Sequence, residues 1–239
     1  MLIQGINRFN SIQYNNLQAK KNIKPQVTTP SFKQEGYVDP AISKDTYRAT
    51  FEESIKKHKD NIFAHLDTVM IDNNGKKVSV TEALQTLFPK EAEEVHYTNL
   101  KHKTMRENVD DIVNNGFDFS KITLTNYGPG VYFGSEGNIQ IYQGDTLNAS
   151  FNGKATTSLN IKSYNQVREK LENEVRNYFR MGFTDIEKVM IEHEVISTAL
   201  NEYCRNKIVD ELGIDGVIAP EVGYFVVFNP NSITDVKRA

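Results

Sequence analysis

The chain has 239 residues, 38% of them hydrophobic and 25% charged, which suffices for one domain with a substantial core plus an extension and a tail. A formal net charge of −3 and a pI near 6.0 exclude a bulk basic field that would drive non-specific binding to nucleic acid. The single cysteine, Cys204, excludes a disulfide framework and is expected to be a small buried hydrophobic residue.

No apolar run approaches the roughly 20 residues that a membrane-spanning helix needs. The N-terminus lacks a basic region followed by a long apolar stretch, so it does not resemble a standard signal peptide. We therefore expect a cytoplasmic protein without a membrane partner, and export by a route that needs no such peptide stays open.

Residues 1–43 are rich in Asn, Gln, Lys, Ser and Thr and contain three prolines, and their apolar residues show no sustained period. This composition predicts a disordered tail. Residues 44–92 differ, because apolar residues from Tyr47 to Val69 recur at helical spacing and predict a helix to about Met70. A turn is predicted at residues 72–75 and a second helix from about Thr81 to Phe88. This helical extension is either an extra packing layer or a cap that regulates a cleft.

Residues 93–239 alternate short strand patterns with longer helical ones. The expected strands are residues 95–98, 131–133, 155–161, 217–219 and 224–228. The expected helices are residues 104–115, 164–180 and 184–212, with Gly116 and Gly213 as stops, whereas residues 139–142 fit either state. Residues 224–228 are apolar on both faces, so they predict a central buried strand. The absence of a regular βαβ repeat favours the α+β class.

A glycine-rich segment, Gly128-Pro129-Gly130, precedes the β-like sequence Val-Tyr-Phe-Gly. A Rossmann phosphate loop needs Gly-x-Gly-x-x-Gly after a strand and at the start of a helix, and neither the spacing nor the context fits. Pro129 also lacks the N–H that a phosphate cradle would use. Taken alone, the segment predicts a tight turn into a strand.

The segment belongs to an ordered set along residues 93–235. His96-Tyr97-Thr98 lies in a strand candidate, Asn-Gly-Phe-Asp closes the next helix, the glycine turn leads to Tyr132, and YFVVFNP spans residues 224–230. This order resembles the poly(ADP-ribose) polymerase-like, H-Y-E branch of the ADP-ribosyltransferases. There a strand carries His-Gly-Ser/Thr, a GFD-like helix end and G-x-G-I/V-Y-F follow, and the closing strand resembles E-Y-V-V-F-N-P. The resemblance implies a split β-sheet with flanking helices that binds NAD.

The resemblance assigns roles to individual residues. His96 would hydrogen-bond a ribose hydroxyl of NAD, since a neutral imidazole can donate from one nitrogen and accept at the other. Tyr97 stands at the family's usual glycine and could contact the carboxamide through its backbone, although its side chain would hinder close approach. Thr98 aligns with the family Ser/Thr. Gly130, in the glycine turn, is also expected to contact NAD.

Two tyrosines are candidates for holding the nicotinamide ring. Tyr132 matches the family tyrosine that stacks on it, because a flat cationic ring gains dispersion and cation–π attraction against an aromatic face. Tyr142, ten residues further on, is either the second aromatic wall or a core tyrosine.

The main departure from the family concerns its catalytic glutamate, whose position directly before the closing strand holds Tyr224. Glu221 lies three residues earlier, which in a regular strand is the opposite face, so it could replace the glutamate only if residues 221–223 form a loop. Three outcomes stay open. Glu221 serves as the carboxylate, an acceptor side chain supplies the base, or the domain binds NAD or ADP-ribose without catalysis.

These observations predict that the protein transfers a single ADP-ribose from NAD to an acceptor and releases nicotinamide without a metal. A protein is the expected acceptor, and nucleic acid is the alternative. The competing hypothesis is a non-catalytic NAD-binding or ADP-ribose-binding module on the same fold. If the resemblance is accidental, His96 and Tyr132 will not face one cleft.

Overall fold

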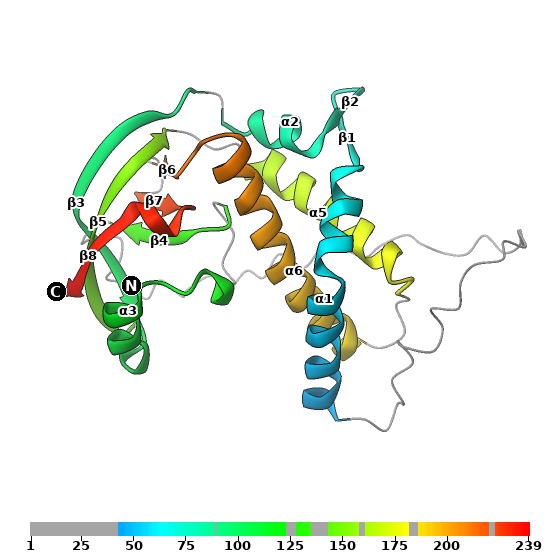
Figure 1. Cartoon of the computed structure of the whole chain (residues 1–239), viewed down its shortest axis with the longest axis horizontal. Coiled ribbons are helices and arrows are strands. Elements are labelled where there is room, and N and C mark those ends of the chain that lie inside the picture. The colour runs from blue at the N-terminus through cyan, green and yellow to red at the C-terminus, as the bar shows by residue number, and fades with distance from the viewer. Residues whose placement is uncertain are drawn as a thin grey trace, which may run out of the picture. The chain divides into compact units, whose positions relative to one another are not determined.

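The structure, a computed structural model, describes residues 43–88, 90–122, 128–134, 143–157, 161–181, 186–219 and 223–239. The tail expected at residues 1–43 lies almost wholly outside them. A six-stranded sheet lies to one side of a group of helices (Figure 1), which confirms the α+β class. No helix of the described ranges is both long and apolar enough to cross a membrane.

The N-terminal described part begins with helix α1 (Lys44–Asp67), whose first turn is capped by the Ser43 hydroxyl. The turn predicted at residues 72–75 is confirmed, but it joins two strands, β1 (Met70–Asn73) and β2 (Lys76–Ser79). Both Asn74 and Gly75 have positive φ, which suits a two-residue hairpin. The extension is therefore not purely helical.

Helix α2 (Val80–Gln85) is shorter than the expected helix. Ser79 is its N-cap and forms a reciprocal capping box with Glu82. The three-residue spacing from Ser79 to Glu82 carries this signal in the sequence.

Helices α5 (Ile161–Tyr178) and α6 (Ile186–Asn206) pack with α1, and α6 continues as a π-helical turn, η4 (Lys207–Glu211). One hydrophobic cluster contains buried residues of α1, the hairpin, α2, α5 and α6 together with Val226 and Phe228 at the sheet. Residues 44–92 are thus a packing layer of this core. Cys204 is buried in the same cluster, as expected, and burial raises the pKa of its thiol to about 12.

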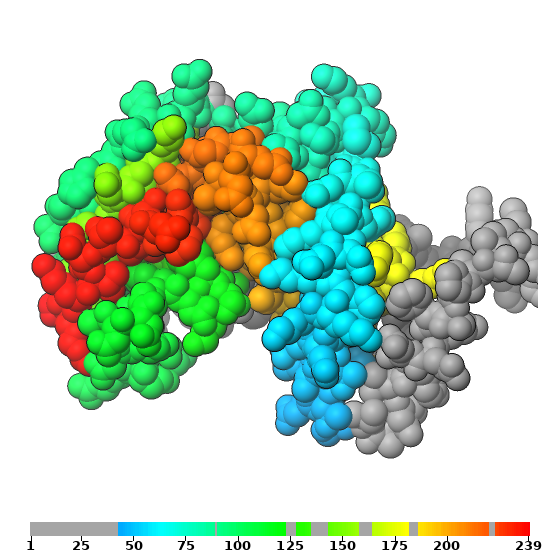
Figure 2. All heavy atoms as spheres, in the orientation of Figure 1, coloured from blue at the N-terminus to red at the C-terminus, as the bar shows by residue number. Residues whose placement is uncertain are grey.

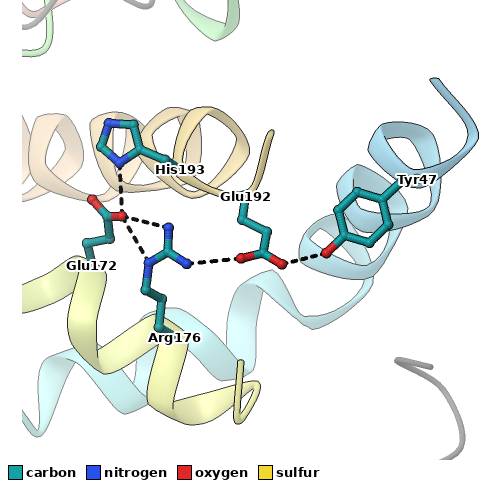
Figure 3. A network of polar contacts seen from close by, with 5 residues as sticks. All are labelled: Tyr47, Glu172, Arg176, Glu192 and His193. Carbon is teal, nitrogen blue, oxygen red and sulfur yellow. Dashed lines mark hydrogen bonds and ion pairs between the residues drawn. The ribbon is translucent and has the colours of Figure 1, made fainter. Parts of the chain in front are cut away.

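A polar network joins the three long helices α1, α5 and α6 (Figure 3). Arg176 of α5 lies between two carboxylates, with Nη1 3.0 Å from Glu192 and Nε 3.1 Å from Glu172. Glu192 also accepts a hydrogen bond of 2.5 Å from the Tyr47 hydroxyl, and His193 Nδ1 lies 2.9 Å from Glu172. Arg176 and Glu192 are buried, so the ion pair is shielded from water.

The sheet contains six strands in the order β3-β4-β7-β6-β5-β8, and β3 also pairs with β5. Their bounds are β3 (Glu93–Thr104), β4 (Val131–Gly134), β5 (Asp145–Thr156), β6 (Gly216–Ala219), β7 (Tyr224–Val227) and β8 (Ile233–Arg238). Because β3 pairs with both β4 and β5, the first five strands of this order close into a circuit. All pairs are antiparallel except β5 with β6. The predicted central strand is confirmed, since β7 lies between β4 and β6.

Other expected elements differ from the structure. The strand predicted at residues 155–161 is wrong, because β5 ends at Thr156 and Ile161 begins α5. Strand β3 continues through Thr104, so the helix predicted from that residue is a 3-10 turn, η2 (Arg106–Asn108), followed by α3 (Val109–Asn115). Gly116 ends α3 as predicted, with φ of 81°. Residues 139–142 lie outside the described ranges.

Candidate functional site

The glycine segment forms the predicted tight turn, in which the Gly130 N–H donates to the Gly128 carbonyl at 3.0 Å. A Cβ on Gly130 would lie 2.2 Å from the carbonyl oxygen of Val227, so only glycine lets this turn pass so close to β7. The turn delivers Tyr132 into β4 opposite Val226. The close approach explains why a glycine precedes the strand.

Tyr132 is half-buried and packs against the helical core. Its hydroxyl donates to the Gly128 carbonyl at 2.9 Å, so the side chain folds back over its own turn. The ring centroid lies 6.2 Å from that of Tyr224 with the planes at 71°, an edge-to-face pair.

His102 of β3 approaches the backbone of Tyr132, and its Nδ1 lies 2.8 Å from the Tyr132 carbonyl oxygen. Because a carbonyl only accepts, Nδ1 must carry the proton, and Nε2 is left as a hydrogen-bond acceptor. Burial lowers the pKa of His102, which favours this neutral form. Edge-on contact with the Phe117 ring, at 5.0 Å between centroids, fixes the imidazole further.

His102 and Tyr132 line a pocket of about 250 Å³, together with α3, the residues that follow it and the glycine turn. Figure 2 shows this part of the chain, in green, at the surface beside the C-terminal strand in red. Asp111, Asp118 and Lys121 are its charged residues. Lys121 Nζ lies 3.4 Å from Asp118 and 4.0 Å from Asp111, and hydrogen bonds from Ser120 lower the pKa of Asp118.

His96, in contrast, is exposed on β3 opposite Asn152 of β5. Strand β4 pairs with β3 at Lys101 and Gly134, and extending this antiparallel register places Tyr132 opposite Lys103, next to His102. His96 lies seven residues before Lys103, which corresponds to roughly 20 Å of strand. The structure therefore brings Tyr132 to His102 and not to His96. His96 and Tyr132 do not line one pocket, which is the arrangement expected if the resemblance at His96 is accidental.

The two residues after His96 also lie outside the pocket. The Tyr97 side chain is exposed, and its ring meets the Phe225 ring at 5.4 Å between centroids. Thr98 is exposed at an irregularity in the pairing of β3 with β5 that lies between Tyr97 and Leu100. Neither side chain belongs to the pocket that His102 and Tyr132 line.

Tyr224 is the first residue of β7 and is half-buried. Gly223, directly before it, forms a turn with φ of 69°, so β7 begins at Tyr224. Glu221 and Tyr142 lie outside the described residues. Tyr224, the residue at which the sequence departs from the resemblance, lies beside Tyr132.

His102 lines this pocket, although the sequence pattern alone does not single it out. Both His96-Tyr97-Thr98 and His102-Lys103-Thr104 fit the pattern His-x-Thr, and both lie in one strand. The second occurrence is the one followed directly by the helical segment. The pairing of β3 with β4 is what places His102, and not His96, beside Tyr132.

Comparison with protein-family models, with curated proteins and with solved structures finds no match to this chain. Among the described residues, no group of three or more His, Cys, Asp or Glu side chains is placed to hold a metal ion.

Proposed function

We propose that the protein binds NAD at the pocket of His102 and Tyr132 and transfers a single ADP-ribose to an acceptor, with release of nicotinamide. The observation that supports this most is the 2.8 Å contact between His102 Nδ1 and the Tyr132 carbonyl. It joins a His-x-Thr strand to the GPGVYFG turn in one pocket. The closed circuit of strands is compatible with a split-sheet transferase fold.

His102 would take the role that the sequence suggested for His96. Its Nε2 would accept a hydrogen bond from a ribose hydroxyl, and the neutral ring avoids burying a charge. The ring of Tyr132 packs with the helical cluster, on the face of β4 opposite Phe133 and the His102 ring. It would offer an aromatic face to nicotinamide in this pocket only after the side chain turns away from that cluster and from Tyr224.

In the transfer step, the bond between ribose C1′ and the nicotinamide nitrogen breaks, and the electron pair leaves with nicotinamide. The nucleophile of the acceptor bonds to C1′ and loses its proton to a base, through a transition state with oxocarbenium character. Glu221 is our candidate for the carboxylate that stabilises this charge or takes the proton. A protein side chain is the expected acceptor, and nucleic acid is the alternative.

A second function, NAD or ADP-ribose binding without turnover, is favoured by one observation. Tyr224 stands where the family places its glutamate, and its ring packs against Tyr132. A phenol that remains protonated near neutral pH cannot supply the negative charge of a carboxylate.

Incubation with NAD labelled in the adenylate half tests the proposal. Transfer of label to protein or nucleic acid, or release of nicotinamide, supports catalysis, and loss of both in Glu221→Gln with retained NAD binding would identify Glu221 as the carboxylate. Binding without either reaction supports the second function. If calorimetry also detects no NAD binding, both functions fail.

A further inference from the structure

Helix α6 contacts the wall of the pocket through two side chains. The Nδ2 of Asn201 donates to the Ile122 carbonyl at 2.9 Å. Arg205, one helical turn later on the same face, donates to the Phe119 carbonyl at 3.4 Å and places its guanidinium 5.2 Å from the centre of the Phe119 ring. Both contacts reach one short segment of the chain.

That segment is the 3-10 turn η3 (Phe119–Lys121) and the residue after it. Lys121 and Ile122 of this segment line the pocket, and so does Asp118 directly before it. Residues 118–122 therefore form one wall of the pocket. The hydrogen bonds within this wall are those of a turn. The Lys121 N–H donates to the Asp118 carbonyl at 3.2 Å, and the Ser120 N–H donates to the Asp118 carboxylate at 3.0 Å. A single 3-10 turn has poor hydrogen-bond geometry and does not persist alone, so its position depends on outside contacts.

Asn201 is buried and Arg205 is half-buried, so both polar groups lose contact with water to different extents. Asn201 is 1% exposed, and its Oδ1 finds no hydrogen-bond partner among the described residues. Burial also lowers the pKa of the Arg205 guanidinium. A leucine at position 201 would avoid the cost of an unpaired amide oxygen. The hydrogen bond from Asn201 Nδ2 to the Ile122 carbonyl in the pocket wall compensates for this cost.

We infer that Asn201 and Arg205 are positioning residues, which hold the 118–122 wall at the geometry that ligand binding requires. They act through this wall and not by touching the ligand. The inference rests on the proposed function, because it takes the pocket to be the NAD site.

Hydrogen–deuterium exchange of the full chain, combined with NAD calorimetry, tests the inference. Asn201→Leu removes the donor at similar volume, and Arg205→Lys keeps the charge but loses the planar guanidinium. Loss of one such hydrogen bond should raise exchange at the 120–122 amides and the NAD dissociation constant about tenfold each. Glu194→Gln is the matched control on the same helix, since Glu194 pairs with Arg48 of α1, and it should change neither quantity.

The exchange rate in the rest of α6 must stay as in the unchanged protein, because a general loss of stability would raise exchange both in α6 and at residues 120–122. Unchanged exchange at 120–122 in both variants would overturn the inference. Faster exchange with unchanged NAD affinity would overturn it as well, since the wall would then not govern binding. If the unchanged protein binds no NAD, the proposed function fails, and the exchange data alone decide whether α6 holds the wall.

Discussion

The imidazole Nδ1 of His102 lies 2.8 Å from the carbonyl oxygen of Tyr132, and this contact joins two segments 30 residues apart in the chain. Strand β3 supplies the histidine, and the glycine turn supplies the carbonyl. Because the carbonyl can only accept, the contact fixes which imidazole nitrogen faces the pocket as an acceptor.

The protonation of His102 is therefore predictable. Nitrogen chemical shifts should show a neutral ring with the proton on Nδ1 at pH 7. Since burial lowers its pKa in the folded state, the unfolded chain binds a proton first as the pH falls below about 6.5. His102 should therefore make the free energy of unfolding decrease with acidification in that window, and His102→Gln should remove this part of the decrease. A protonated ring at pH 7 would contradict this prediction.

Gly130 should tolerate no side chain, because a Cβ would lie 2.2 Å from the Val227 carbonyl oxygen. Gly130→Ala is expected to lower the free energy of unfolding by roughly 1–3 kcal/mol, the usual effect of overpacking. Gly116→Ala is the comparison, since that site has open space but φ of 81°, and it should cost about 1 kcal/mol through backbone strain alone. Urea titrations measure both, and equal stability of Gly130→Ala and the unchanged protein would rule out the close approach.

The buried pair of Arg176 and Glu192 should respond asymmetrically to substitution (Figure 3). Arg176→Met leaves the carboxylate of Glu192 buried without its cation, which should cost roughly 3–5 kcal/mol of unfolding free energy. The double variant with Glu192→Leu should be more stable than Arg176→Met alone, because it also removes the stranded charge. Arg48→Met, which breaks the exposed pair with Glu194, should cost at most about 1 kcal/mol. A double variant less stable than the single one would refute this account.

Much of the fold follows from local sequence signals. Tyr224 to Val227 form the central strand because their side chains are apolar on both faces, and Gly116 ends its helix through a positive φ. The sequence did not predict strand β8, because among the described residues it pairs with β5 alone, and of its own residues just Ile233 and Val236 pack against the sheet core there. Such an edge strand shows little apolar alternation.

The site was harder to predict than the fold. The turn before Tyr132 was predictable, since its glycines precede a β-like run. The sequence pointed to His96, and the position of His102 beside Tyr132 was not predictable, because both histidines head a His-x-Thr sequence and the register of β3 against β4 comes only from the structure. The contacts of Asn201 and Arg205 span about 80 residues of chain, and no periodic pattern encodes them.

Calorimetric titration of NAD into the unchanged protein, His102→Gln and His96→Gln tests the central claim most directly. We predict that NAD binds the unchanged protein and His96→Gln with similar affinity, whereas His102→Gln loses the ribose contact and binds at least about tenfold more weakly. Equal binding by His102→Gln, or selective loss of binding in His96→Gln, would contradict the account.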